Sequence, residues 1–259
     1  MTVMDKFKME GYCSIVTGGA TGLGNAMAKA FAEMGSNIVI ADLDGAKAEQ
    51  AAAEIRSEKG VQVLVVQADV TKMADVDHVV AEAENTFGKI DVLLNNAGIV
   101  RNAKAEEMSY QDWNDVINVN LNGVFLMSQA VGRVMILQKR GSIINISSMS
   151  GIIVNTPQCQ CAYNASKAAV IALTKSLAAE WANHAVRVNT IAPGYMKTEL
   201  TRKFFENGGG MTDKWMEMTP MGRPGVPEDL GGIAVYLASE ASSYATGGVF
   251  VVDGGYTVL

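Results

Sequence analysis

Short runs of apolar residues alternate along this chain with longer segments that mix apolar and polar residues at helical spacing. Seven runs have the composition of strands: CSIVT (13–17), NIVIAD (37–42), VQVLVVQ (61–67), IDVLLNN (90–96), GSIINISS (141–148), AVRVNTIAP (185–193) and GGVFVVDGG (247–255). Their nearly uninterrupted apolarity is typical of strands buried on both faces of a sheet. Intervening segments such as 24–35 and 44–60 end in a glycine, which commonly terminates a helix. The pattern predicts an α/β fold: a doubly wound, seven-stranded parallel sheet with helices on both faces.

The length of the chain favours one domain spanning residues 1–259. The 259 residues are 49% hydrophobic, which suffices for a substantial core, and no glycine-proline linker divides them. A stretch at about 195–222 is rich in methionine, glycine and charge and matches no strand. We interpret it as a mobile lid over a substrate, with a plain surface insertion as the alternative.

Composition narrows the possible functions to chemistry on small molecules. The formal net charge is −6 and the densest basic cluster is only Lys139-Arg140, so we expect no nucleic-acid and no membrane partner. No apolar run has the length of a signal peptide or membrane span, and the three cysteines form no CxxC pair, which predicts a cytoplasmic protein. The two histidines, His78 and His184, lack a second ligand at metal spacing, so we expect no metal site.

A glycine-rich turn follows the first predicted strand. The segment TGGATGLG places Gly18, Gly22 and Gly24 between that strand and a helix, where phosphate can approach the helix N-terminus. The alternative is an ordinary tight turn. Asp42 ends the second strand, where its carboxylate would accept hydrogen bonds from an adenosine ribose and repel a 2′-phosphate. Since the following residues LDGAK contain no arginine, the sequence predicts NAD as the cofactor, with NADP disfavoured.

Further motifs appear in a characteristic order: ADV (68–70), NNAG (95–98), INISS (144–148), YNASK (163–167) and IAPG (191–194). With TGGATGLG, they resemble the short-chain dehydrogenase/reductase family over essentially the whole chain. The resemblance implies a Rossmann-type domain that transfers hydride between NAD(H) and a secondary alcohol or ketone. The implied cofactor contacts are Thr17, Gly18, Thr21, Gly22, Leu23, Gly24, Asp42, Leu43, Asp69, Val70, Asn96, Ala97, Gly98, Tyr163, Lys167, Pro193, Gly194, Met196 and Thr198.

Tyr163 and Lys167 are the candidate acid-base pair. Residues four apart share one face of a helix, so the ammonium would lie beside the phenol. We expect Lys167 and an oxidised nicotinamide ring to lower the tyrosine pKa from its usual value of about 10. An isolated Y-x-x-x-K would more simply be an exposed aromatic and a solvated charge.

The resemblance extends this pair to a catalytic tetrad. Its S-x-x-G pattern selects Ser148, with Ser150 as the alternative. VNLNG supplies Asn120, although Asn118 and Asn122 are close neighbours. The implied tetrad is Asn120, Ser148, Tyr163 and Lys167, and it needs no metal.

The substrate is suggested by the polar loop before Tyr163. Asn155, Gln158 and Gln160 have side chains suited to hydrogen bonds with a polyol or sugar, and the loop resembles that of polyol dehydrogenases and ketose reductases in the family. A 3-oxoacyl reductase or another hydrophobic-alcohol dehydrogenase is the alternative, favoured by Met and Phe at 204–221. An alternative of another class is a non-catalytic dinucleotide-binding sensor or scaffold.

Excess apolar surface on two predicted helices suggests self-association. The segments 112–138 and 168–182 are apolar around most of their circumference, so packing on the sheet leaves another apolar face to cover. The family resemblance implies a homotetramer built on these helices and the last strand.

Overall fold

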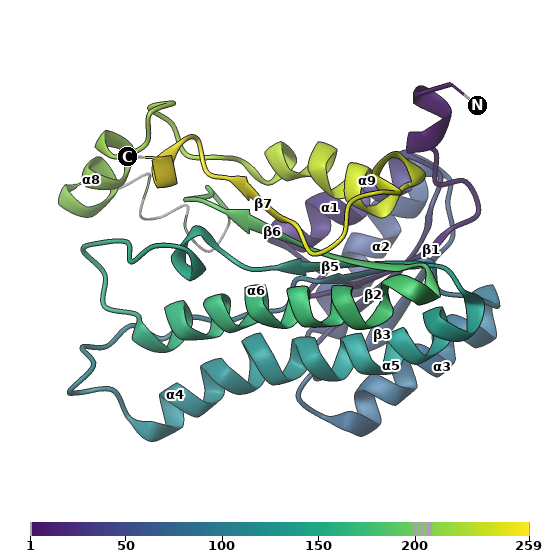
Figure 1. The fold of residues 1–259 in the computed structure, drawn as a ribbon, viewed down its shortest axis with the longest axis horizontal. Helices are drawn as coiled ribbons and strands as arrows, with labels where there is room; N and C mark the ends of the chain where they lie inside the picture. The colour runs from purple at the N-terminus through teal and green to yellow at the C-terminus, as the bar shows by residue number, and fades with distance from the viewer. Residues whose placement is uncertain (1, 199–200, 202–204, 206–208, 259) are drawn as a thin grey trace.

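The computed structural model describes residues 2–198, 201, 205 and 209–258. Its strands form one sheet in the order β3-β2-β1-β4-β5-β6-β7, and every neighbouring pair is parallel (Figure 1). The strands are β1 (Cys13–Thr17), β2 (Asn37–Asp42), β3 (Val63–Gln67), β4 (Val92–Asn95), β5 (Gly141–Ile146), β6 (Val186–Pro193) and β7 (Val249–Val252). All seven expected strands are confirmed, most of them shorter than their apolar runs.

Helices cover both faces of the sheet (Figure 1). Those on one face are α1 (Gly22–Glu33), α2 (Gly45–Lys59) and α9 (Gly231–Ala238), and those on the other are α3 (Met73–Phe87), α5 (Val124–Gln138) and α6 (Cys161–Trp181). Successive strand residues point to opposite faces: Val92 and Leu94 of β4 belong to the first core, and Leu93 to the second. Burial on both faces explains why the strand sequences show little polar alternation.

The helix expected over 112–138 is interrupted. It consists of α4 (Tyr110–Ile117), a π-helical turn (Asn118–Gly123) and α5. Gly123 is the last residue of this turn and packs against the connection between β3 and α3. A Cβ on Gly123 would lie 2.7 Å from Val70 Cγ2. Single π-helical turns are rare and often occur at functional sites. The turn contains Asn120, one of the predicted catalytic residues.

The carboxyl ends of the strands form the functional edge of the sheet. The strand order changes direction between β1 and β4, and open α/β sheets bind ligands at the carboxyl edge beside such a point. The helix α8 (Gly210–Glu217) lies at this end, beside the chain's carboxyl terminus (Figure 1). It belongs to the expected lid at 195–222, of which residues 199–200, 202–204 and 206–208 lie outside the described residues. Among the described residues, no helix combines the length and apolarity needed to span a membrane.

Candidate active site

The glycine turn joins β1 to α1 and leaves the N-terminus of the helix accessible. Gly18 (φ +63°) and Gly22 (φ +58°) have left-handed backbones, which glycine adopts without strain. A Cβ on Gly24 would lie 2.3 Å from the Gly18 carbonyl oxygen, so that position also requires glycine. Thr21 is the N-cap of α1, and its side chain makes no capping hydrogen bond with the described residues. The first N–H groups of α1 are thus available to an anion.

The NNAG segment holds this turn in place. The Thr17 hydroxyl accepts hydrogen bonds from the backbone N–H groups of Asn96 (3.0 Å) and Ala97 (3.1 Å). The Asn96 amide donates to the carbonyl oxygen of Gly18 at 2.9 Å. A Cβ on Gly98 would approach Lys167 Nζ to 3.5 Å, which places the end of the motif beside the predicted catalytic pair.

Asp42 lies at the carboxyl end of β2, next to the glycine turn. Its carboxylate accepts hydrogen bonds from the backbone N–H groups of Ala20 (3.0 Å) and Asp44 (3.1 Å), which fix its orientation. Asp44 itself caps α2 by accepting a hydrogen bond from the Lys47 N–H. Leu43 is exposed to 66%. Asp69 accepts from the backbone and hydroxyl of Thr71, which shapes the ADV turn.

Tyr163 and Lys167 lie one turn apart near the start of α6. Lys167 is only 3% exposed, and its Nζ donates a hydrogen bond to the carbonyl oxygen of Ile146 at 2.8 Å. The same Nζ lies 5.6 Å from the centre of the Tyr163 ring. Burial lowers the pKa of Lys167 to about 8. Lys167 is therefore buried and oriented by β5, and Tyr163 beside it is half-buried, unlike an exposed tyrosine and a solvated lysine.

Ser148 is the serine that reaches the phenol. Burial raises the pKa of Tyr163, and a hydrogen bond with Ser148 opposes this with a smaller effect. The expected lowering of this pKa is thus absent from the chain alone, because desolvation outweighs its partners. Ser150 instead donates to Asn155 Oδ1 at 2.9 Å, and its backbone N–H donates to Ser148 Oγ at 3.1 Å. Gly151 lets this loop touch α6: a Cβ there would lie 2.6 Å from the carbonyl carbon of Lys167.

Asn120 is fully buried and its side chain is engaged by the protein. Its Oδ1 accepts from the Ile99 N–H at 2.8 Å, and its Nδ2 donates to the Ile99 carbonyl at 2.9 Å and to Ser166 Oγ at 3.1 Å. It therefore ties the π-helical turn to the segment after NNAG and to α6. The neighbouring Asn118 and Asn122 bond each other in an exposed position.

The three polar loop residues expected to contact substrate make most of their hydrogen bonds within the protein. Asn155 Nδ2 and Gln158 Nε2 each donate to the Tyr195 hydroxyl at 2.9 Å. The Gln160 amide nitrogen donates to Ser150, Asn155 and Asn164, whereas its Oε1 accepts nothing from the described residues. Gln160 is thus the member of the three that keeps a polar atom available.

The turn after β6 contains the remaining predicted contacts. Gly194 packs against Asp253, with 2.6 Å between its would-be Cβ and the Asp253 Cα. Met196 is buried, and the Thr198 hydroxyl pairs with Thr201 at 3.1 Å. Sequence reasoning overlooked Tyr195 between them; an aromatic side chain directly after a Pro-Gly turn was the available signal.

Comparison with known proteins identifies this arrangement. A family model described as enoyl-(acyl carrier protein) reductase matches residues 18–257. Galactitol 2-dehydrogenase (L-tagatose-forming) of Cereibacter sphaeroides is 43% identical over 252 residues, covering 97% of each chain. The chain belongs to the short-chain dehydrogenase/reductase family.

Two other members of the family, both similar to this chain, have different names and substrates. A solved gluconate 5-dehydrogenase from Burkholderia cenocepacia, in complex with NADP and tartrate, is 38% identical, with a TM-score of 0.93 over all of both chains. A 3-oxoacyl-[acyl-carrier-protein] reductase of Chlamydia trachomatis is 40% identical over 245 residues, covering 93% of this chain and 96% of the relative.

Membership makes this chain an oxidoreductase of CH–OH groups that uses a nicotinamide dinucleotide. The residues present fit such a cofactor. Gly22 is the first residue of α1, and apart from its own neighbours in the chain no atom of the described residues lies within 4 Å of a would-be Cβ there, so an anion can approach the helix N-terminus. Among the described residues, no group of three or more His, Cys, Asp or Glu is placed to hold a metal ion.

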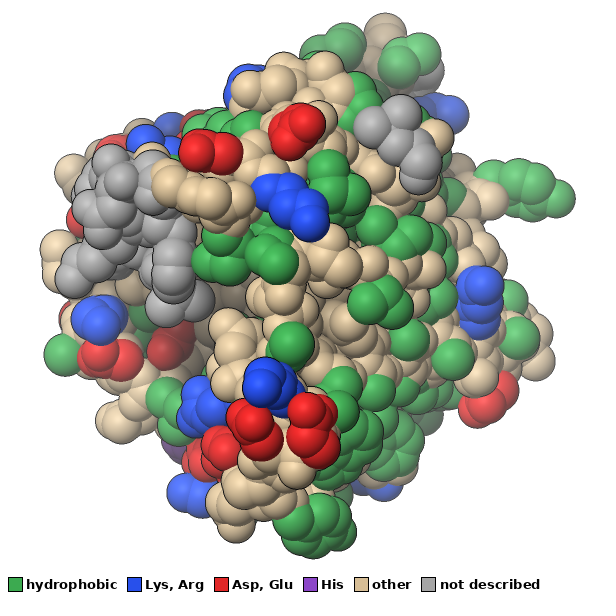
Figure 2. Space-filling view, turned by 90° about the vertical axis from the view of Figure 1, so that its left-hand side faces the viewer, with side chains coloured by type: hydrophobic (Ala, Val, Ile, Leu, Met, Phe, Trp, Pro, Cys, Tyr) green, Lys and Arg blue, Asp and Glu red, His purple; other side chains and the backbone are tan. Residues whose placement is uncertain are grey.

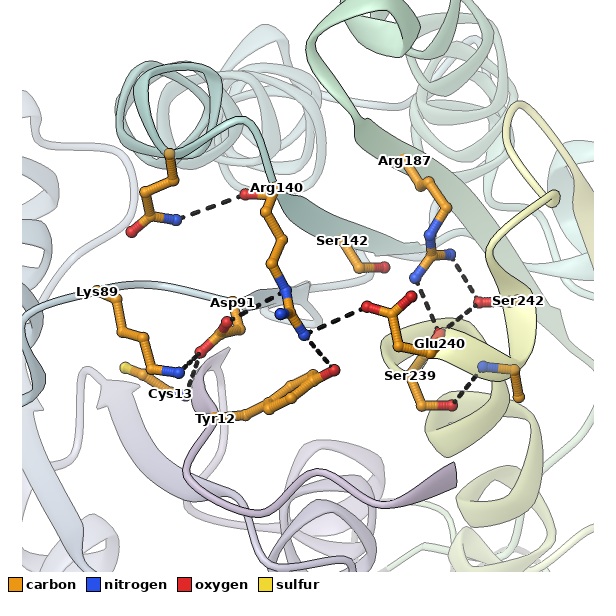
Figure 3. Close-up of polar contacts among 12 residues, drawn as sticks. Tyr12, Cys13, Lys89, Asp91, Arg140, Ser142, Arg187, Ser239, Glu240 and Ser242 are labelled. Carbon is orange, nitrogen blue, oxygen red and sulfur yellow. Dashed lines mark hydrogen bonds and ion pairs between the residues drawn. The ribbon is translucent and has the colours of Figure 1, made fainter. Parts of the chain in front are cut away.

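A hollow of about 720 Å³ lies elsewhere, at the amino ends of the strands, and Figure 3 shows polar contacts among the side chains around it. Its charged groups satisfy one another: Asp91 pairs with Lys89 at 3.1 Å, and Arg140 with Glu240 at 3.2 Å. Arg187 donates to the Leu237 carbonyl at 2.9 Å, at the end of α9. Because family chemistry belongs to the carboxyl edge, we attribute this cluster to stability.

Figure 2 looks onto the carboxyl edge. In its visible part, acidic and basic side chains are interspersed with uncharged ones and form no continuous patch of one sign. This surface favours a neutral substrate over a polyanion.

Proposed function

We propose that this enzyme oxidises a polyol to the corresponding ketose, and reduces the ketose, with NAD(H). The observation that carries this proposal is the 43% identity to galactitol 2-dehydrogenase over 97% of both chains. The interspersed charges at the carboxyl edge and the polar loop before Tyr163 support it.

The proposed chemistry assigns a role to each buried polar residue at this edge. The bound nicotinamide supplies the hydride acceptor or donor. Tyr163 takes the hydroxyl proton of the alcohol during oxidation and returns it during reduction. Ser148, which bonds the phenol, holds the substrate oxygen beside it, and Lys167 holds the nicotinamide ribose. Because the Asn120 side chain is engaged elsewhere, the group it offers to a water is its backbone carbonyl, in the π-helical turn.

NAD is the proposed cofactor because of the charge and setting of Asp42. Its carboxylate is oriented by two backbone N–H groups, and the residues after it carry no arginine to receive a 2′-phosphate. Relatives with NADP exist in the family, so this residue, and not family membership, supports the preference.

Gln160 is the proposed substrate contact of the polar loop. Its Oε1 can accept a hydrogen bond from a substrate hydroxyl, three positions before Tyr163. Asn155 and Gln158 act indirectly, through Tyr195.

We also propose a homotetramer in a reducing, cytoplasmic setting. Apolar side chains are exposed on α5 (Phe125, 41%; Leu137, 85%) and on the edge strand β7 (Val251, 42%), which supports two kinds of contact between copies. The odd number of cysteines favours a reducing compartment.

A 3-oxoacyl reductase is the second candidate, favoured by the 40% identity to the Chlamydia trachomatis enzyme. The deciding experiment measures initial rates of NADH formation with tetritols, pentitols and hexitols, and of NADH oxidation with ketoses and an acetoacetyl thioester. Each assay is repeated with NADP(H). We expect the highest kcat/KM with a polyol or ketose and NAD(H). Turnover restricted to the thioester would transfer the proposal to the second candidate.

The catalytic assignment has its own test in Tyr163→Phe. Losing the phenolic proton should lower kcat by about 10²- to 10⁴-fold, the usual worth of general acid-base catalysis. NADH binding, followed by quenching of protein fluorescence, should stay near the wild-type affinity. A Phe variant with substantial turnover would contradict the role given to Tyr163.

A further inference from the structure

Tyr195 connects four segments at the carboxyl edge. Its ring stacks on Trp215 of α8, with centroids 4.1 Å apart and planes 14° apart. It also meets Tyr256, near the carboxyl terminus, edge-on at 5.3 Å. Its hydroxyl accepts hydrogen bonds from Asn155 and Gln158, both in the loop before α6. One side chain thereby binds the β6 turn, the loop, the lid helix and the terminus together.

The orientation of the Gln158 amide is fixed chemically. Trp215 Nε1 carries only a donor, and it lies 3.2 Å from Gln158 Oε1. The amide nitrogen of Gln158 must then face the other way, toward the Tyr195 hydroxyl. The indole, the amide and the phenol form a closed set of contacts that links α8 to the loop at two points.

This set continues to the catalytic serine. Asn155, which donates to Tyr195, accepts from the Ser150 hydroxyl at 2.9 Å. The backbone N–H of Ser150 in turn donates to Ser148 Oγ at 3.1 Å. Burial raises the pKa of Tyr195, so its phenol stays protonated at neutral pH and keeps these contacts. The lid helix is therefore connected to Ser148 through Tyr195 and Asn155.

We infer that Tyr195 is a positioning residue that sets substrate specificity, by locking α8 against the 152–160 loop. When α8 is held against the 152–160 loop, the polar groups of these two segments stay at fixed positions. Fixed polar groups favour a substrate with several hydroxyl groups over a small alcohol that contacts few of them. The inference rests on the proposed function only for the identity of that substrate.

The first test is Tyr195→Phe, which keeps the ring stack and removes the hydroxyl. With the best polyol, KM should rise about tenfold, as expected for two lost neutral hydrogen bonds. The kcat, the NADH affinity and the KM for a small alcohol such as 2-butanol should change by less than about threefold. The matched control is Tyr256→Phe, which removes a hydroxyl of the same aromatic cluster, bonded to Met218 Sδ at 3.5 Å, but none of the bonds to Asn155 and Gln158.

Two readouts separate this lock from a general structural effect. In a double-mutant cycle, the effects of Gln158→Leu and Tyr195→Phe should be clearly less than additive, because both remove the hydrogen bond between Gln158 and Tyr195. Equal KM increases for the polyol and the small alcohol, equal effects of the Tyr256→Phe control, or fully additive effects would overturn the inference.

A measurement made without substrate distinguishes failure of the inference about Tyr195 from failure of the proposed function. Limited tryptic cleavage at Lys214, in α8, should be faster in Tyr195→Phe than in the wild type, because an unlocked helix opens more often. If the wild type turns over no polyol yet this difference is present, the proposed function fails and the lock stands. If polyols are substrates and cleavage is unchanged, the lock fails alone.

Discussion

Lys167 and Tyr163 share a helix face, but burial governs their protonation. The lysine ammonium has a backbone carbonyl partner and is removed from water, so its pKa falls to about 8. The phenol is also desolvated, and its pKa rises in the chain alone. A cofactor that brings positive charge to this site would favour phenolate, the direction catalysis needs, and would also lower the pKa of Lys167 further.

The Lys167 pKa predicts a pH dependence of stability. Its ordinary value is 10.5, so between pH 8 and 10.5 the unfolded chain binds more protons than the folded chain and stability rises with pH. In cofactor-free protein, the free energy of unfolding of the wild type relative to Lys167→Met should increase by about 2 kcal/mol from pH 7.5 to 9.5. Urea denaturation at several pH values measures it. The opposing effect of Cys13, whose pKa burial raises to about 12, is common to both proteins and cancels. A flat difference would contradict a buried charged lysine.

Asp42 predicts the cofactor preference. Asp42→Asn removes the charge and keeps an oxygen that can accept a backbone hydrogen bond. The ratio of kcat/KM for NADP to that for NAD should rise about tenfold or more, because the repulsion of a 2′-phosphate is lost. Asp44→Asn is the control, since that exposed carboxylate caps α2 and should leave the ratio unchanged. An unaltered ratio in Asp42→Asn would remove the basis for preferring NAD.

At the level of elements, close backbone contacts hold the site together. The loop after β5 touches α6 at Gly151, where a Cβ would meet backbone atoms of Lys167 and Ala168 at 2.6 to 2.8 Å. Backbone cannot yield as a flexible side chain can, so the loop and the helix are held in one relative position. Because Ser148 lies on this loop and Lys167 on the helix, the two side chains are held in a fixed relative position as well.

Gly151→Ala should therefore lower both stability and activity. We expect a loss of about 1–3 kcal/mol in the free energy of unfolding, typical of overpacking, and a lower kcat as the loop moves off α6. Gly232→Ala is the matched control: it lies in α9, and outside its own helix no atom of the described residues is within 4 Å of its would-be Cβ, so alanine should stabilise by up to about 0.5–1 kcal/mol. Thermal and urea unfolding of both variants measure the difference in sign. A neutral Gly151→Ala would show that the contact relaxes freely.

The elements differ in how far the sequence could predict them. The strands follow from runs whose residues are apolar on both faces, and the glycine turn from positions where only glycine fits. The π-helical turn at VNLNG could not be foreseen, because its composition suits an ordinary helix and the partners of Asn120 within it, Ile99 and Ser166, are distant in sequence. The engagement of Gln158 depends on Tyr195 and Trp215, 37 and 57 residues away in sequence.

For the whole molecule, the two apolar surfaces predict a tetramer with two kinds of interface. The chain mass is 27.5 kDa, so light scattering after size-exclusion chromatography should give about four times that value. Val251→Lys charges the outer strand β7 and should leave dimers held by the α5 and α6 surface.

Adding Phe125→Glu, on α5, should yield monomers, because it charges the second surface as well. Met4→Lys is the control: this side chain is 71% exposed at the amino terminus, away from both surfaces, and its substitution should leave the mass unchanged. A wild-type mass equal to one chain would contradict the assembly, and a Val251→Lys variant that remains tetrameric would exclude β7 as an interface. Since α6 carries Tyr163 and Lys167 and belongs to the surface shared with α5, loss of that contact should lower activity more than loss of the β7 contact.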